Sequence, residues 1–167
     1  NVKSRQDSEV RKFMKELEEQ IETQKLDENS VLFVDGSKVL EKGTVSGLVA
    51  GKLASKYFRP VVLMRERDSS TWGGSMRGYD KGTITDTKSF LESIGVTCMG
   101  HANASGILLK KEDLQSVIKK CNEALPIESL CTVHTVDWEI PATQLKKDYV
   151  IEVAQNYKVF GNNVPEP

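Results

Sequence analysis

Two short segments rich in small residues carry the side chains best suited to chemistry. In the first, Arg77 follows Gly74 and Ser75, and a guanidinium offers a rigid fork of donors that matches phosphate oxygens. In the second, which runs from Gly100 to Gly106, His101 stands among alanine, asparagine and serine residues. Such small neighbours let a flat or charged ligand approach the imidazole closely. Both segments are candidates for phosphate or nucleotide binding, and we expect Arg77 and His101 to converge on one glycine-lined concavity.

Each segment also has a purely structural interpretation. A cluster of glycine, serine and arginine is common in flexible surface loops. His101 could instead follow a helix stop in a tight turn and cap a backbone carbonyl. The residue types alone leave the binding and the structural interpretations open for both segments.

The stretch around the first segment is locally basic, although the whole chain has a formal net charge of -1. Two aromatic residues beside Arg77, Trp72 and Tyr79, could stack on bases or belong to the core. A basic patch can therefore coexist with a nearly neutral protein. The basic residues of this stretch are Lys52, Lys56, Arg59, Arg65, Arg67, Arg77 and Lys81, and the acidic ones are Glu66, Asp68 and Asp80.

The residues needed for metal-dependent hydrolysis are scarce. Only two histidines occur, His101 and His134, and no aspartate adjoins either of them. Cys98 with His101 would supply two ligands, whereas a closed zinc site needs four. Asp35 before a glycine reads as a turn residue. We therefore expect no catalytic residue, metal site or cofactor in this chain.

The length of 167 residues indicates about one domain, and 38% hydrophobic and 28% charged residues are typical of an ordinary soluble protein. The three cysteines lack C-x-x-C spacing, so buried, reduced thiols are expected. No apolar run is long enough to span a bilayer and no secretory pattern opens the chain, which favours a cytoplasmic location without a membrane partner. Because the chain starts at Asn1, we expect it to be part of a longer protein.

Hydrophobic periodicity predicts an α/β fold with a central, mostly parallel or mixed sheet, flanked by helices and preceded by a long helix. Five helices are expected. The first covers about Ser4 to Lys25, and the second is opened by Gly43 and Thr44 and has Val45, Leu48, Val49 and Leu53 on one face. A short third helix is capped by Thr85 or Asp86 and ended by Gly95, a fourth contains Leu114 to Cys121, and the last runs from Pro141 to about Asn156. Expected strands cover 31–34, 61–64, 71–77 and 107–109, with weaker strand character from Leu130 to Trp138 and a loop over 160–167.

The two candidate segments together resemble the signature loops of the DHH-associated domain in RecJ-type single-strand exonucleases, which read roughly G-S-x-R-S and G-G-H-x-x-A-A-G. Further similarity lies in 43–53 with the following Arg59 and Pro60, in 1–6, and in 160–167. The chain departs from the pattern at four places: Met99 replaces a glycine, Gly78 a serine and Ser105 an alanine, and Glu41 with Lys42 stand where a His-Pro pair is usual.

This resemblance implies a linker helix over 1–28, a nucleic-acid-binding DHH-associated domain over 29–125, and an extension over 126–167 toward an OB-fold domain. It also implies that single-stranded DNA is the partner and that a catalytic DHH domain, with Mn or Mg, lies outside this chain. The parent would then be a metal-dependent nuclease of DNA repair or recombination. The implied substrate-binding residues are Gly74, Ser75, Arg77, Gly100, His101, Ala102, Asn103 and Gly106.

Two other functions stay open at this point. The parent could be a phosphodiesterase for short oligonucleotides or cyclic dinucleotides, as smaller DHH relatives are. It could also be a non-catalytic scaffold in replication or repair.

Overall fold

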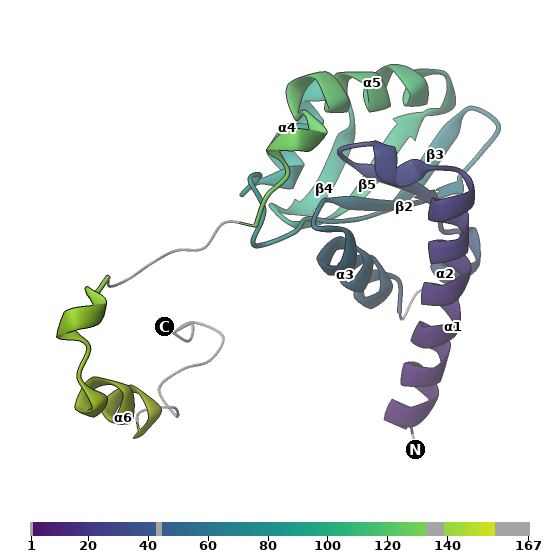
Figure 1. Ribbon diagram of the computed structural model, residues 1–167. Coiled ribbons are helices and arrows are strands. Elements are labelled where there is room, and N and C mark those ends of the chain that lie inside the picture. Colours follow the sequence, from purple (N-terminus) through teal and green to yellow (C-terminus); the bar gives the residue numbers. More distant parts are fainter. Residues whose placement is uncertain (1, 43–44, 133–138, 156–167) are drawn as a thin grey trace. The chain divides into compact units, whose positions relative to one another are not determined.

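The computed structural model describes residues 2–42, 45–132 and 139–155, with the backbone alone for residues 2–6 and 42. The chain divides into two compact units, Asn1–Val133 and His134–Pro167. The first unit is a layered arrangement in which helices cover both faces of one sheet (Figure 1). The predicted α/β fold with a mixed, helix-flanked sheet is confirmed.

The sheet has five strands in the order β1-β2-β3-β5-β4. Strands β1 (Leu32–Asp35) and β2 (Val61–Glu66) are parallel, as expected for two neighbouring strands of one sheet that are connected through a helix. The other pairs, formed by β3 (Thr71–Arg77), β5 (Ala104–Lys110) and β4 (Thr97–His101), are antiparallel. The glycine- and alanine-rich segment around His101 is thus a β-hairpin, where the sequence predicts only a turn followed by a strand at 107–109.

Helices α1 (Val2–Thr23), α2 (Ser37–Lys42) and α3 (Ser46–Tyr57) lie on one side of the sheet. The long first helix and α3 were both predicted, whereas α2 was not. Apolar residues of α1 at helical spacing, from Val10 to Ile21, are buried against β1, β2 and α3. In α3, Val49 and Leu53 join this core.

One prediction for α3 is wrong. Leu48 was expected on the buried face with Val49 and Leu53, but 45% of its surface is exposed. The helix turns its Val45, Val49 and Leu53 stripe to the sheet, and Leu48 lies beside that stripe on a different face. This orientation makes Leu48 part of a surface depression.

Helices α4 (Thr87–Ile94) and α5 (Leu114–Ala124) cover the opposite face of the sheet (Figure 1). Both were predicted, and α4 begins and ends as expected. The Asp86 carboxylate accepts from the backbone N–H of Ser89, and Gly95 ends the helix with a φ of 111°.

The two faces of the sheet are covered unequally over β5 and β4. On the α4/α5 side, Cys98, Ile107 and Leu109 are buried. On the α3 side, the side chains at Met99 and His101 are exposed, and Met99 retains 62% of its surface. The open half-face beside α3 is therefore where a ligand can reach the sheet.

Outside the sheet, the structure differs from two predictions. Residues 130–132 form no strand, and the remainder of the predicted strand to Trp138 lies outside the described residues. The second unit has a short 3-10 turn at Ala142–Gln144 and then α6 (Lys147–Gln155), instead of one helix from Pro141. Leu145 adopts an extended backbone between them, which interrupts the helix. The predicted loop at 160–167 lies outside the described residues.

Gly74 is required by strand pairing, which gives a first prediction. A Cβ at Gly74 would collide with the backbone carbonyl of Leu63 on β2, whereas a Cβ at Gly51 in α3 would meet nothing within 4 Å. Gly74→Ala should therefore lower the free energy of unfolding by about 2 kcal/mol or more. Gly51→Ala should raise it by roughly 0.5–1 kcal/mol, because alanine loses less backbone entropy in a helix. Urea unfolding measures both, and equal stability of the two variants would contradict this account.

Candidate nucleic-acid interface

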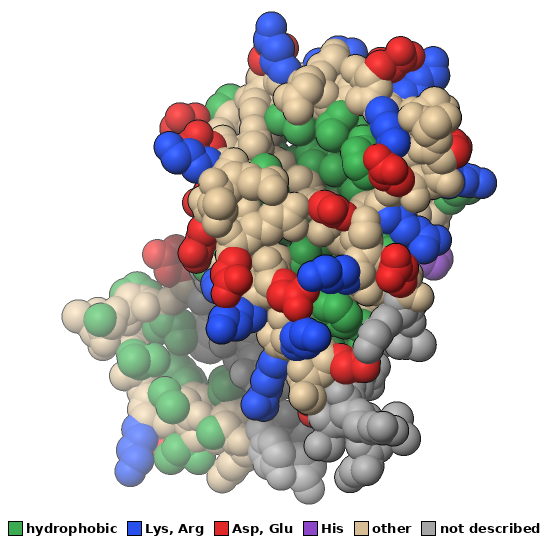
Figure 2. Space-filling model, turned by 90° about the vertical axis from the view of Figure 1, so that its right-hand side faces the viewer, with side chains coloured by type: hydrophobic (Ala, Val, Ile, Leu, Met, Phe, Trp, Pro, Cys, Tyr) green, Lys and Arg blue, Asp and Glu red, His purple; other side chains and the backbone are tan. Residues whose placement is uncertain are grey.

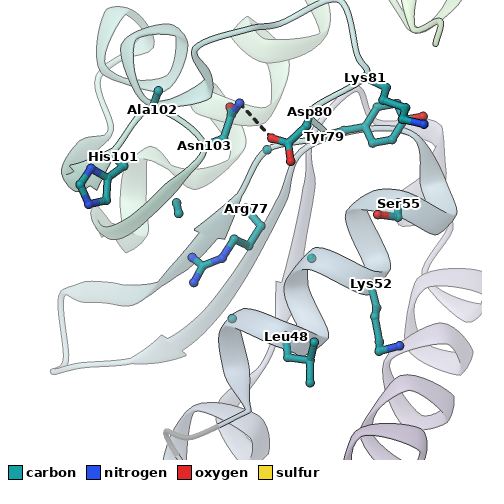
Figure 3. A pocket seen from close by; sticks show the side chains of 14 residues that line it. Leu48, Lys52, Ser55, Arg77, Tyr79, Asp80, Lys81, His101, Ala102 and Asn103 are labelled. Carbon is teal, nitrogen blue, oxygen red and sulfur yellow. Dashed lines mark hydrogen bonds between the residues drawn. The ribbon is translucent and has the colours of Figure 1, made fainter. Parts of the chain in front are cut away.

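A pocket of about 1050 Å³ opens between α3 and the adjoining ends of β3, β4 and β5 (Figure 3). Three segments that are far apart in the sequence meet there: one side of α3, the end of β3 with the loop after it, and the turn of the β4–β5 hairpin. Its lining residues are Gly47, Leu48, Gly51, Lys52, Ser55, Arg77, Gly78, Tyr79, Asp80, Lys81, His101, Ala102, Asn103 and Ala104.

Strand register brings Arg77 and His101 to the same face. Ala104 on β5 pairs with Arg77 on one side and with His101 on the other. Side chains of directly paired antiparallel residues point to the same side of the sheet, so the guanidinium and the imidazole flank a single methyl group. Figure 3 shows Arg77 between α3, which carries Leu48 and Lys52, and the hairpin that carries His101. The two residues share one pocket, while their role in binding stays a prediction.

The guanidinium of Arg77 occupies a gap that a missing side chain provides. A Cβ at Gly47 in α3 would collide with Nη2 of Arg77. Arg77 Nη1 donates to the carbonyl of Met76 at 2.8 Å and lies 3.5 Å from the Ser75 hydroxyl. Among the side chains that the structure describes, no carboxylate lies within 4.0 Å of this guanidinium. Its charge is thus available to an anionic ligand.

The pocket carries more positive than negative charge. Lys52, Arg77 and Lys81 line it together with one carboxylate, Asp80. By contrast, the face of the first unit seen in Figure 2 intersperses basic and acidic side chains. Local excess of one sign within a concave surface raises the attraction for an anion.

The predicted basic patch is smaller in the structure than in the sequence. Lys56 pairs with Glu18 at 2.7 Å. Arg59 donates to the backbone carbonyls of Asp27 and Asn29, each at 2.7 Å, and burial lowers the pKa of this guanidinium. Both residues therefore hold the fold together, and neither lines the pocket.

Asn103 acts as a clamp for the hairpin turn. Its carbonyl oxygen accepts from the Thr87 hydroxyl at 2.8 Å and from the Thr87 N–H at 3.3 Å. Its amide nitrogen donates to Asp80 and to the carbonyl of Thr85, each at 3.2 Å. A Cβ at Gly78 would collide with this amide, so Gly78 provides its space. Asn103 lines the pocket, but its polar atoms are already engaged in supporting it.

The other predicted site residues divide into two groups. Ala102 lines the pocket, and its carbonyl accepts from the Lys88 N–H at 2.8 Å. The second group comprises Gly74, Ser75, Gly100 and Gly106, which do not line it. Gly100 has a φ of 139°, and a Cβ there would lie 2.7 Å from the Ala104 carbonyl, so the hairpin itself requires glycine.

Sequence reasoning missed the contribution of α3 to the pocket. Gly47, Gly51 and Ser55 recur every four residues, which places small side chains along one helix face. In the structure these three residues line the open pocket. Of the two aromatic candidates, Tyr79 lines it, while Trp72 is at the opposite end of β3 beneath the ammonium of Lys111.

Metal and thiol chemistry receive no structural support within the described residues. No group of three or more His, Cys, Asp or Glu side chains gathers there in a way that could hold a metal ion. Burial raises the pKa of Cys98 and raises that of Cys121 to about 12, as expected for buried thiols. Cys131 is exposed, so the expectation of three buried cysteines is wrong for this residue.

The chain is similar along its whole length to proteins named as nucleases. A prophage SPbeta protein of Bacillus subtilis strain 168, named as the single-strand DNA-specific exonuclease YorK, is 37% identical over 175 aligned residues. The single-stranded-DNA-specific exonuclease RecJ of the same organism is 28% identical over 163 residues, which cover 95% of this chain. No family model matches the chain.

The chain spans only part of these relatives, 30% of YorK and 20% of RecJ. It therefore corresponds to a segment of longer exonuclease-named proteins. No helix in the described part of the chain is long and apolar enough to cross a membrane.

The Asn103 clamp gives a second prediction. Asn103→Ala removes four side-chain hydrogen bonds, leaves the Thr87 hydroxyl without this partner and leaves the space beside Gly78 empty. The free energy of unfolding should therefore fall by about 1–3 kcal/mol. Lys119→Ala, which removes an exposed side chain of α5, should change it by less than about 0.5 kcal/mol. Urea unfolding compares the two variants with the wild type. Wild-type stability of Asn103→Ala would show that the hairpin turn is held by something else.

Proposed function

We propose that this chain is the substrate-gripping part of a RecJ-like, single-strand-specific DNA exonuclease. The observation that carries the proposal is the unpaired guanidinium of Arg77, which faces a pocket shared with Lys52, Lys81 and His101. Similarity along the whole chain to proteins named as single-strand DNA-specific exonucleases supports it.

In this proposal Arg77, Lys52 and Lys81 bind the phosphates of a single DNA strand, and His101 donates a further hydrogen bond to the sugar-phosphate backbone of that strand. Cationic side chains in a concave surface attract the phosphate backbone without reading its sequence. The small side chains of glycine and alanine on the open half-face let the DNA strand approach the sheet closely. The clamp at Asn103 and the gap at Gly47 position these groups before the ligand arrives.

Cleavage is assigned to a different part of the parent protein. We place it on a metal-dependent DHH domain that holds Mn²⁺ or Mg²⁺, outside this chain. Most of each exonuclease-named relative lies beyond the similarity, which leaves room for such a domain. The isolated chain should therefore bind DNA without degrading it, as part of a cytoplasmic enzyme of DNA repair or recombination.

The position of Arg77 can be tested through its neighbour Gly47. Gly47→Ala should push the guanidinium out of its gap and weaken binding of a labelled single-stranded oligodeoxynucleotide about tenfold, close to the effect of Arg77→Ala. Ser116→Ala, at an exposed position of α5 on the opposite face of the sheet, is the control and should leave the affinity unchanged. Fluorescence anisotropy measures the affinities. Unchanged affinity in both Arg77→Ala and His101→Ala would refute the assignment of this site.

Substrate length separates a single-strand exonuclease from a phosphodiesterase for dinucleotides. We expect affinity to rise from a dinucleotide to a longer oligomer, because Lys52 on α3 and Arg77 on β3 lie on different segments of the pocket and can contact different phosphates. Isothermal titration calorimetry with a linear dinucleotide, a cyclic dinucleotide and a twelve-residue oligomer measures this. Tight binding of a dinucleotide with no gain for the longer strand would favour the smaller enzyme class.

A further inference from the structure

The pocket face of α3 continues past the pocket to an exposed aromatic ring. Gly47, Gly51 and Ser55 line the pocket at intervals of one turn, and Phe58 is the residue that caps the C-terminal end of this helix. From Gly47 to Phe58 the helix advances about 16 Å at 1.5 Å per residue. Stacked nucleotides of one strand lie roughly 3.4 Å apart, so several nucleotides fit along this length.

Phe58 is unusual in both exposure and backbone conformation. The side chain keeps 54% of its surface exposed, although large aromatic side chains are usually buried. Its φ of 55° and ψ of 34° lie in the left-handed region, where a bulky residue is strained and glycine is usual at a helix end. A residue that costs stability without filling the core points to another role for its ring.

Neighbouring contacts hold Phe58 in this conformation. The next residue, Arg59, donates from Nε to the Tyr57 carbonyl at 2.9 Å and from Nη1 to two carbonyls after α1. These hydrogen bonds fix the backbone on either side of Phe58 to the segment that follows α1. A rigidly presented ring loses little entropy when a ligand stacks on it.

The ring is also joined to the pocket. Phe58 and Tyr79 meet edge to face with centroids 5.7 Å apart and an interplanar angle of 77°. Tyr79 lines the pocket, and its hydroxyl shares a hydrogen bond of 3.0 Å with the hydroxyl of Thr132. The edge-to-face arrangement positions the Phe58 ring through an anchored partner.

We propose that Phe58, supported by Tyr79, is a stacking platform for one nucleobase of the single strand whose phosphates occupy the adjoining pocket. This inference rests on the proposed function. Lys52 lies on the same helix between Gly47 and Phe58, so a strand that follows α3 keeps its phosphates near cations while a base reaches the ring. Every base has a π-face, so the platform suits an enzyme that accepts any sequence.

Two substitutions at position 58 separate stacking from folding. Phe58→Asn removes the ring and suits the left-handed backbone, so the variant should fold at least as stably as the wild type. It should nevertheless bind a twelve-nucleotide oligodeoxynucleotide about 5- to 150-fold more weakly, the range that corresponds to the loss of one stacked base. Phe58→Trp should retain wild-type affinity. Wild-type affinity of Phe58→Asn for this oligomer, alongside weakened binding by Arg77→Ala, would overturn the platform and leave the proposed function intact.

Salt dependence and an abasic strand identify the missing contact. Phe58→Asn should keep the wild-type slope of log affinity against log salt, whereas Lys52→Ala should reduce that slope by roughly 0.7. For an abasic oligomer of the same length, Phe58→Asn and wild type should bind equally. A defect of Phe58→Asn that persists on the abasic strand would contradict stacking. If the wild type binds neither strand, the proposed function fails and the platform with it.

Discussion

The structure depends on one unusual arrangement, a guanidinium with no carboxylate partner within reach among the described residues, held at the end of a strand. Arg77 projects from β3 into the gap left by Gly47 and is steadied by the Met76 carbonyl. A cation is usually paired or extended into solvent, whereas this one is fixed in place without neutralisation. Lys52 and Lys81 add charge of the same sign around it, and the pocket is therefore prepared for an anion.

The remaining features of the site preserve this arrangement. Asn103 ties the hairpin turn to Asp80 and to the start of α4, so His101 keeps its place across Ala104 from Arg77. Two of the glycines near the site serve the fold at close approaches: Gly74 admits a neighbouring strand, and Gly78 admits the Asn103 amide. Several residues of the two predicted segments therefore support the fold and do not line the pocket.

Much of the architecture could be predicted because hydrophobic periodicity reports burial. The strand at 71–77, the cap at Asp86 and the stop at Gly95 all follow from local rules. The β4 strand was missed because its short sequence, with Cys98 and Met99 adjacent, lacks apolar alternation, and its pairing with β5 supplies the order instead. Leu48 was misplaced because a helix face is set by the elements packed on it. Which lysines and arginines stay free also depended on tertiary contacts, as the pairing of Lys56 with Glu18 illustrates.

The central claim concerns which arginine meets the ligand, and Arg59 provides an internal reference because backbone carbonyls already engage its guanidinium. Nuclear magnetic resonance of the arginine Nε–H groups during titration with single-stranded DNA tests it directly. We predict that the Arg77 resonance shifts and saturates with the strand while the Arg59 resonance stays in place. An unmoved Arg77 resonance at saturating DNA would contradict the account.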